Sequence, residues 1–163
     1  MNTWLQTLGF GLGRLLEERG LTLALAESCT GGLIAKIVTD VPGSSGYFNG
    51  GVVAYSNAVK ERVLGVPGLD LESYGAVSSQ VALAMAAGVR NLLGSHIGLS
   101  VTGIAGPGGG SPEKPVGLVY IGLALSNDSK YIKCLFEGDR EQVREATAAK
   151  ALEELLKYLQ VNG

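Results

Sequence analysis

Residues 22–38 read TLALAESCTGGLIAKIV and place a strand, a tight turn and a helix in direct succession. The apolar run Thr22–Ala26 is bounded by polar residues and is typical of a buried strand, whereas Leu33–Val38 favours a helix. Two glycines between them mark the turn, so Ser28 lies where the strand passes into the helix. This arrangement predicts an α/β fold with Ser28 at a strand end.

The rest of the chain continues the alternation of helices and strands. Further helices are expected from residue 2 to 19, from the cap Ser56 to Leu64, from Ser78 or Ser79 to Leu93, and from the cap Asp139 to Leu159. Further strands are expected at residues 47–55, 97–102, 117–125 and 131–136, and the last two are expected to form a hairpin. Residues 69–75 are expected to be a connection without regular structure. This order predicts a three-layer α/β/α sandwich around a mixed sheet of about five or six strands. We expect a single domain over residues 1–163.

Composition indicates a soluble globular protein. The 163 residues are 46% hydrophobic and 17% charged, and the formal net charge is -2 with no basic stripe. Nucleic acid and an anionic membrane are therefore not expected partners, whereas a small anionic ligand is compatible with this charge. No apolar run approaches the roughly 18–20 residues of a membrane span, and the N-terminus lacks a charged start followed by an apolar stretch. We expect a cytoplasmic protein.

Histidine and cysteine counts restrict the chemistry. His96 is the only histidine, and most zinc sites and Ser-His-Asp triads depend on that side chain. Its place just before an apolar strand favours a structural or surface role. Cys29 and Cys134 are too few for a disulfide framework and are expected to be reduced. The sequence therefore predicts a site without a metal or a cofactor.

Glycine, at 25 residues, is concentrated in three regions rather than in a repeat: residues 31–32, 43–51 and 103–110. The stretch Thr102–Ser111 directly follows a buried strand, where ligands bind in open α/β sheets. It contains neither the Gly-Lys-Ser/Thr end of a phosphate loop nor the dinucleotide pattern Gly-x-Gly-x-x-Gly. We interpret it as a ligand-binding loop; the alternative is a flexible surface connection.

Ser28 is the candidate nucleophile. If a helix opens after Gly31 and Gly32, the N–H groups of its first turn can hold a phosphate or the oxyanion of an attacked amide. The segment is equally compatible with Ser28 or Thr30 acting only as a helix cap. Cys29 is a rival nucleophile, because a thiol at a helix N-terminus can have a lowered pKa. Neighbouring residues at a turn project in different directions, so one of the two is expected to face the site and the other the core.

A serine nucleophile needs a base, and the candidate loops contain no histidine. A partly buried lysine can supply a neutral amine, and Lys60 follows the strand end at Tyr55, whose hydroxyl could relay a proton or orient the substrate. The alternatives are a solvated Lys60 and a Tyr55 that closes the core. Arg140 and Arg144, four residues apart, could clamp a phosphate or pair with nearby carboxylates.

Several motifs of this chain occur together in a known family. They are AESCTGG at residues 26–32, PGSS at 42–45, VAYSN at 53–57 with Lys60, GAVS at 75–78, TGIAGP at 102–107 with KPVG at 114–117, and GDR at 138–140. In these segments the chain resembles the CinA C-terminal-domain family. The resemblance covers most of the chain, from residue 22 to residue 145.

The resemblance implies an amidohydrolase that needs no metal and converts nicotinamide mononucleotide to nicotinic acid mononucleotide and ammonia in pyridine-nucleotide recycling. It implies Ser28 as nucleophile, Lys60 as its base and Tyr55 as a further catalytic residue. The residues expected to bind the substrate are Glu27, Thr30, Gly31, Gly32, Ser44, Ser45, Thr102, Gly103, Ala105, Gly106 and Arg140. Ser44 and Ser45 could also bind phosphate or replace Ser28 as the reacting hydroxyl. Members are often oligomeric, so a homo-oligomer is expected.

Two other functions stay open at this point. Gly-rich loops and Arg140 would also suit a non-catalytic module that binds a pyridine nucleotide or another phosphorylated ligand. A structural part in DNA uptake rests only on the family's association with competence, and the acidic balance of the chain argues against direct DNA contact.

Overall fold

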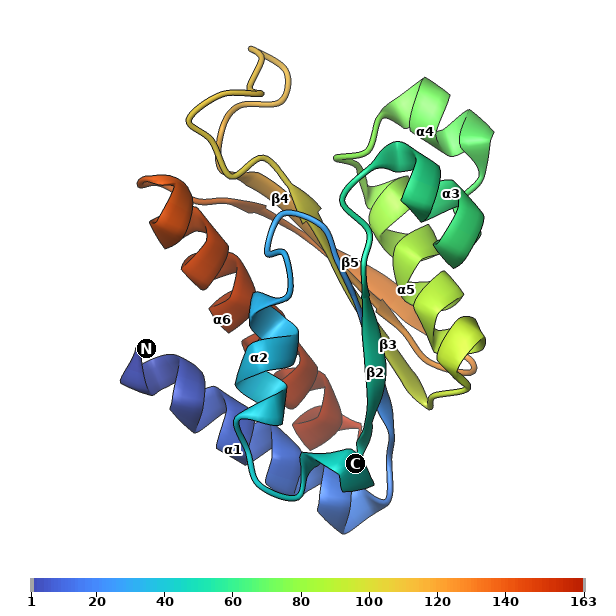
Figure 1. Cartoon of the computed structure of the whole chain (residues 1–163), viewed down its shortest axis with the longest axis vertical. Coiled ribbons are helices and arrows are strands. Elements are labelled where there is room, and N and C mark those ends of the chain that lie inside the picture. The colour runs from blue at the N-terminus through green and yellow to red at the C-terminus, as the bar shows by residue number, and fades with distance from the viewer. Residues whose placement is uncertain (1, 163) are drawn as a thin grey trace.

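A five-stranded mixed sheet lies between two layers of helices in the computed structural model, which describes residues 2–162 (Figure 1). The strand order is β2-β1-β3-β4-β5. The strands are β1 (Leu23–Glu27), β2 (Phe48–Val53), β3 (Ile97–Gly103), β4 (Leu118–Ala124) and β5 (Ser129–Leu135). β1 pairs in parallel with β2 and β3, whereas β4 pairs antiparallel with β3 and β5. The expected fold class and the hairpin are confirmed.

Helices cover both faces of the sheet (Figure 1). One face carries α1 (Thr3–Arg19), α2 (Leu33–Thr39) and α6 (Arg140–Val161), and the other carries α3 (Asn57–Leu64), α4 (Gly68–Tyr74) and α5 (Ser79–Leu93). α5 packs on β1, β3 and β4, while α3 and α4 pack on α5. A short 3-10 helix, η1 (Ser44–Gly46), precedes β2. β1 is therefore covered on both sides, and all five of its residues are buried.

Alternate residues of β1 serve two apolar clusters, because successive side chains of a strand point to opposite faces. Leu23 and Leu25 belong to the larger cluster, which joins α1, α2 and α6 to the sheet. Ala24 and Ala26 belong to the smaller cluster beneath α5. The small alanines let α5 lie close to the strand whose end carries Ser28, and this packing fixes the position of that end.

The expected helix caps are confirmed. The side chains of Ser56, Ser78 and Asp139 accept hydrogen bonds from the first turns of α3, α5 and α6. The last helix continues to Val161, two residues beyond the expected end. Within residues 2–162, no helix combines the length and apolarity that crossing a membrane requires.

The connection expected at residues 69–75 is wrong, since Gly68–Tyr74 form α4. This helix begins after Pro67, which offers no side-chain cap, and its first residue is a glycine. The segment therefore lacks the Ser, Thr, Asp or Asn that marks a helix start in a sequence. Its conformation depends on packing against α5, which local sequence does not reveal.

Candidate active site

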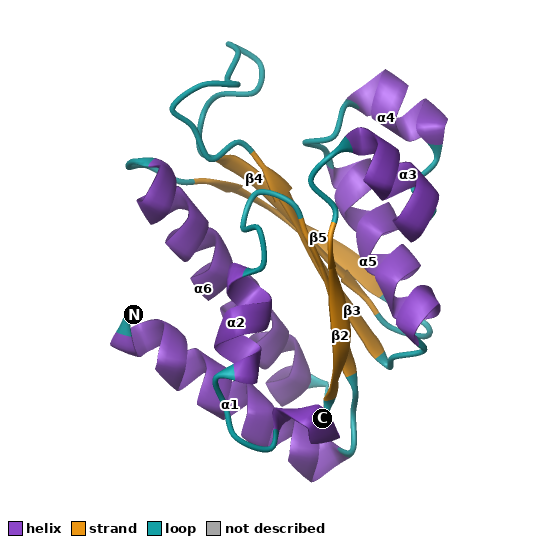
Figure 2. Ribbon diagram, in the orientation of Figure 1, coloured by secondary structure: helices purple, strands orange, loops and turns teal. Residues whose placement is uncertain are grey.

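Three strand ends bring the candidate residues together. Ser28 follows β1, Tyr55 follows β2, and Thr102 lies near the end of β3. Because β1 runs parallel to β2 and to β3, the carboxyl ends of these strands lie at the same edge of the sheet. Figure 2 shows the loops that follow them gathered at one end of the molecule. The candidate site is built at this edge.

Ser28 and Lys60 are in direct contact. The Lys60 Nζ donates to Ser28 Oγ at 3.1 Å and to the Tyr55 carbonyl at 3.3 Å. Lys60 is only 2% exposed and Ser28 only 8%. Lys60 sits in the first turn of α3, and side chains on a helix lean toward its N-terminus, so the amine reaches back to the strand ends. The alternative of a solvated lysine does not hold.

The environment of Lys60 favours its neutral form. Burial lowers the pKa of the Lys60 ammonium below its usual value, and the nearby Cys29 thiol opposes this shift in part. A lower pKa raises the fraction of neutral amine near pH 7. A neutral amine can accept the Ser28 hydroxyl proton, which is what a base beside a serine nucleophile must do.

Cys29, the rival nucleophile, lies in the apolar cluster beneath α2 and α6. Burial raises the pKa of its thiol to about 11. Near neutral pH the sulfur is therefore protonated, and a protonated thiol is a poor nucleophile. The side chains of Ser28 and Cys29 point in different directions at the turn. The Ser28 oxygen contacts Lys60, and the Cys29 side chain lies in the core.

Glu27 occupies the N-terminus of α2. Its buried carboxylate accepts from the Thr30 hydroxyl at 2.5 Å and from the backbone N–H groups of Ile34 at 3.0 Å and Ala35 at 2.9 Å. The first-turn N–H groups that the sequence suggested for a phosphate or an oxyanion are therefore already bonded, because Glu27 is itself the anion at this helix end. Glu27 and Thr30 hold the turn that carries Ser28 and do not line the pocket.

Arg140 joins two walls of the site. Its guanidinium donates to the Gly106 carbonyl at 2.7 Å and to the Tyr55 hydroxyl at 2.9 Å. Gly106 belongs to the loop after β3, and Tyr55 lies beyond β2 with 59% of its surface exposed. A guanidinium has five N–H donors, so Arg140 is held in place and still has donors for a ligand.

Arg144 binds backbone instead. Its guanidinium donates to the carbonyls of Cys29 at 3.2 Å and Thr30 at 2.8 Å. The clamp in which both arginines share a phosphate is therefore not formed.

The turn after β1 continues through Gly31 and Gly32, whose φ values of 61° and 105° suit glycine and are strained for other residues. These glycines shape the turn and do not line the pocket.

A pocket of about 190 Å³ opens above Ser28. It is lined by Ser28, Cys29, Tyr55, Asn57, Lys60, Ala76, Val77, Thr102, Gly103, Ala105 and Arg140. This lining has one arginine, one lysine and no carboxylate, which favours a neutral or anionic ligand. Ligand pockets usually measure about 300–1,000 Å³, so this one suits a small group rather than a whole nucleotide.

Part of the pocket wall was not among the expected site residues. Asn57, Ala76 and Val77 lie within the motifs VAYSN and GAVS, but none has a titratable side chain to signal a functional position. The hydroxyl of Thr102 donates to the Ala76 carbonyl at 2.8 Å. Thr102 therefore holds one wall of the pocket against the end of β3.

Glycines of the loop after β3 are needed for packing. A Cβ at Gly103 would lie 2.6 Å from the Val119 side chain. A Cβ at Gly106 would lie 2.5 Å from the Val116 side chain, and the φ of Gly106 is 84°. Close approach of the loop to its own chain therefore explains these two glycines, whereas Gly108 has open space around it.

Ser44 and Ser45 lie at the other end of the sheet. They form η1, which precedes β2, and β2 runs parallel to β1. They therefore lie at the amino ends of the strands, while Ser28 lies at the carboxyl ends. Neither serine lines the pocket, so within one chain neither can contact a substrate held at Ser28. A motif match assigns a segment to a family but does not place it in space.

His96 also lies at the amino ends of the strands, just before β3. Its Nδ1 accepts from the Thr22 N–H at 3.0 Å. The histidine therefore links the starts of β1 and β3, which is the structural role expected from its position.

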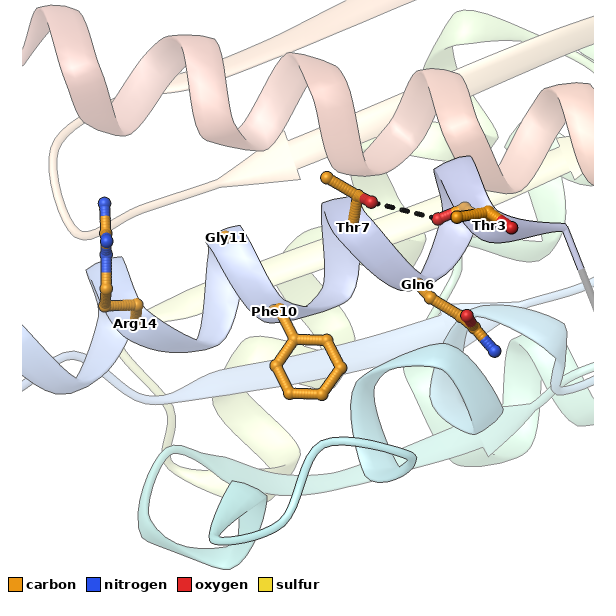
Figure 3. Close-up of a pocket in the computed structure, with 6 residues that line it drawn as sticks. All are labelled: Thr3, Gln6, Thr7, Phe10, Gly11 and Arg14. Carbon is orange, nitrogen blue, oxygen red and sulfur yellow. Dashed lines mark hydrogen bonds between the residues drawn. The ribbon is translucent and has the colours of Figure 1, made fainter.

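A second pocket, on the outer face of α1, has no such chemistry (Figure 3). It is lined by Thr3, Gln6, Thr7, Phe10, Gly11 and Arg14. All six come from one helix, and the Thr7 hydroxyl is bonded to the Thr3 carbonyl at 3.0 Å. No nucleophile lies beside a base on this face, so the candidate active site is the pocket at Ser28.

Residues 6–159 match the family model described as the CinA C-terminal domain. Two relatives, each named CinA-like protein, come from Geotalea uraniireducens and Geobacter sulfurreducens. They are 54% identical over 154 and 153 residues, which cover 94% of this chain in both cases. The chain spans 37% of the length of each relative.

Solved structures share the whole fold. The crystal structure of a competence/damage inducible protein from Agrobacterium tumefaciens is 40% identical, with a TM-score of 0.93 and coverage of 96% of both chains. A competence-damaged protein (CinA) superfamily structure from Escherichia coli is 30% identical, with a TM-score of 0.92, and the match covers 97% of this chain and 92% of that one. The architecture is therefore retained at a sequence identity of 30%.

Proposed function

The chain belongs to the CinA C-terminal domain family, and from that membership and the geometry of its site we propose that it hydrolyses the carboxamide of nicotinamide mononucleotide. The observation that carries the proposal is the 3.1 Å contact between Lys60 Nζ and Ser28 Oγ. A buried lysine beside a serine, at the carboxyl ends of parallel strands, supplies the nucleophile and the base of an amide hydrolase.

The first half of the reaction forms an acyl-enzyme. Neutral Lys60 takes the proton of the Ser28 hydroxyl, and Oγ attacks the carboxamide carbon, whose oxygen becomes an oxyanion. When the tetrahedral intermediate collapses, the C–N bond breaks and the nitrogen takes the proton from the Lys60 ammonium, so ammonia leaves. Ser28 is then an ester of the pyridine carboxylate, and Lys60 is neutral again.

The second half of the reaction hydrolyses the acyl-enzyme and regenerates free Ser28. Lys60 takes a proton from water, and the resulting hydroxide attacks the ester carbon. The ester bond to Oγ breaks, the proton returns to Ser28, and nicotinic acid mononucleotide is released. The balance is one amide and one water consumed, and one acid and one ammonia formed. The hydroxyl of Tyr55, at the rim of the same pocket, is available to relay a proton or orient the amide.

Pocket size and charge support a substrate with a small amide-bearing ring and an anionic tail. A pocket of about 190 Å³ suits the pyridine carboxamide, which leaves the ribose phosphate at the rim. Arg140 lies at that rim with guanidinium donors still available. We propose that these donors bind the phosphate.

Incubation of the protein with nicotinamide mononucleotide, followed by measurement of released ammonia and of nicotinic acid mononucleotide, tests the proposal. We expect both products in equal amounts. Folded protein that is stabilised by the nucleotide but forms neither product would instead indicate a non-catalytic binding module.

A further inference from the structure

The oxyanion of the proposed reaction needs a hydrogen-bond donor beside Ser28, and the first turn of α2 does not supply it. The N–H groups of Ile34 and Ala35 in that turn donate to the Glu27 carboxylate. The end of β3 also adjoins the nucleophile, because the Ser28 N–H donates to the Val101 carbonyl at 3.1 Å. The main chain of β3 is therefore a second place for such a donor.

The alternation of hydrogen bonds along β3 fixes the direction of the Gly103 N–H. This strand lies between β1 and β4, and the N–H and C=O groups of successive residues point alternately to these two neighbours. The Val101 carbonyl accepts from Ser28, on the β1 side, whereas the Ile104 N–H donates to the Leu118 carbonyl at 2.9 Å, on the β4 side. Gly103 lies two residues after Val101 and one before Ile104. Both contacts therefore direct its N–H toward β1.

The strand that would accept from the Gly103 N–H ends just before it could do so. The ladder between β1 and β3 stops at the pair Glu27 and Val101. The next acceptor in the ladder would be the Ser28 carbonyl, but this carbonyl accepts from the Gly31 N–H at 3.0 Å instead. Within residues 2–162, no other loop or side-chain oxygen accepts from the Gly103 N–H. The pocket, which Ser28 and Gly103 both line, takes the place of the missing carbonyl.

We propose that the Gly103 N–H is an oxyanion-hole donor, which binds the carbonyl oxygen of the substrate amide where the next carbonyl of β1 would lie. This inference rests on the proposed attack of Ser28 on a carboxamide. As Oγ attacks, the C=O double bond becomes a single bond, its electron pair moves to the oxygen, and the Gly103 N–H donates to the resulting oxyanion. The strand holds this donor before the reaction, so it stabilises the developing charge without reorganisation.

The spacing of the strands suits this role. Neighbouring strands lie about 4.8 Å apart, and an N–H group donates to an oxygen at about 2.9 Å from its nitrogen. An oxygen bonded to the Gly103 N–H therefore lies in line with the end of β1, where the Ser28 side chain begins. A carbonyl that is attached to Ser28 Oγ can place its oxygen there.

Glycolic acid in place of Gly103 tests the inference, because the resulting ester lacks the N–H and changes no side chain. Loss of one oxyanion donor lowers kcat by about 100- to 1,000-fold, and KM is expected to change little. Alanine does not serve the purpose, since a Cβ at Gly103 would lie 2.6 Å from the Val119 side chain. A wild-type kcat in the Gly103 ester would overturn the inference.

The matched control is leucic acid in place of Leu125, which makes the same change at the opposite end of the sheet. The Leu125 N–H is bonded, since it donates to the Asp128 carbonyl at 2.8 Å in the turn between β4 and β5. This ester is expected to lower the urea midpoint more than the Gly103 ester does and to retain wild-type kcat. An equal fall of kcat in both esters would contradict a specific role for Gly103.

A boronic acid tests the donor in the unaltered protein and without the nucleotide. Pyridine-3-boronic acid accepts a lone pair of Ser28 Oγ at boron, the hydroxyl proton passes to Lys60, and the boron becomes tetrahedral, with one of its hydroxyl oxygens in the place of the oxyanion. Boron NMR identifies the tetrahedral adduct. The Gly103 amide proton is expected to move downfield when this adduct forms, because its N–H gains an acceptor, while the Leu125 amide proton stays in place. A Gly103 resonance that does not move would overturn the inference.

The outcomes separate this inference from the proposed function. Protein that forms the adduct with a shifted Gly103 resonance but does not hydrolyse nicotinamide mononucleotide would reject the substrate and support the donor. Protein that hydrolyses the nucleotide at full rate as the Gly103 ester would support the substrate and reject the donor. Neither hydrolysis nor a tetrahedral adduct in the wild-type protein would reject both.

Discussion

The amine of Lys60 lies 3.1 Å from the hydroxyl oxygen of Ser28, although 32 residues separate them in the chain. The contact exists because β1 and β2 are parallel neighbours and α3 begins directly beyond β2. Both side chains are buried, so the pair is shielded from water at the floor of the pocket. This geometry makes the roles of the two residues separable by substitution.

Ser28→Ala is expected to abolish turnover and to leave the nucleotide bound. Loss of a serine nucleophile lowers kcat by about 10⁴-fold or more. Cys29→Ala is the matched neighbour, and it is expected to retain activity because the Cys29 thiol is protonated and lies in the core. Ammonia release and calorimetric binding measure the two effects. Activity that survives in Ser28→Ala and disappears in Cys29→Ala would transfer the nucleophile to the thiol.

The rate is expected to rise with pH through the pKa of Lys60. Only the neutral amine can accept the serine proton, and burial lowers the pKa of Lys60, so the rise in kcat/KM should be centred below the usual lysine pKa of about 10.4. The measurement is kcat/KM from about pH 5 to about pH 10.5, which reports the titration of the free enzyme. In Lys60→Arg the guanidinium stays protonated, so this variant is expected to lose the activity and, with it, the rise of the rate with pH. A rate that does not vary with pH over this range would argue against Lys60 as the base.

The same pKa predicts how stability changes with pH. Between the lowered pKa of folded Lys60 and the usual value of about 10.4, the unfolded chain binds a proton that the folded chain does not. The Lys60 contribution therefore makes the free energy of unfolding rise with pH in this window. Urea titrations carried up to about pH 10 should show this rise in the wild type and a flatter profile in Lys60→Met. Parallel profiles would mean that folding does not lower the pKa of Lys60.

The convergence of Ser28, Tyr55 and Thr102 follows from sequence pattern, because each lies at the end of an expected strand and parallel strands share their carboxyl edge. The grip of Arg144 on the Cys29 and Thr30 carbonyls does not, since backbone carbonyls carry no sequence signal. A sequence motif also does not reveal at which end of the sheet its segment lies.

Ser44 illustrates this limit. It belongs to a loop that matches the family, yet that loop precedes β2 and so lies at the amino ends of the strands. Helix α4 was missed for a different reason, since it has no capping side chain and depends on contact with α5. Local pattern thus indicates which residues carry chemistry, and strand order decides which of them meet.

Two glycines of the loop after β3 are expected to respond differently to alanine. Gly106→Ala forces a φ of 84° on a residue with a Cβ that would lie 2.5 Å from Val116, so we expect a loss of about 1–3 kcal/mol in the free energy of unfolding. Activity should fall as well, because the Gly106 carbonyl holds Arg140. Gly108→Ala has open space and should stay within about 0.5 kcal/mol of wild type. Equal urea midpoints for the two variants would contradict the packing argument.

Arg140→Gln is expected to remove the preference for a phosphorylated substrate. The Arg140 guanidinium is positioned by the Gly106 carbonyl and the Tyr55 hydroxyl, and its remaining donors lie at the pocket rim. A charge-assisted bond to phosphate contributes about 1.5–3 kcal/mol, so kcat/KM for nicotinamide mononucleotide should fall by roughly 10- to 150-fold. For nicotinamide riboside, which lacks the phosphate, the fall should be much smaller.

The ratio of the two kcat/KM values is the decisive measurement, because a general disturbance of the site lowers both by the same factor and leaves the ratio unchanged. Tyr55→Phe is the matched control, since it removes the hydroxyl that Arg140 binds and keeps the guanidinium. It should lower the rate for both substrates through the loss of a polar contact, while the preference for phosphate is retained. If Arg140→Gln leaves the ratio at its wild-type value, Arg140 serves only to join the Tyr55 and Gly106 walls, and the phosphate must be bound elsewhere.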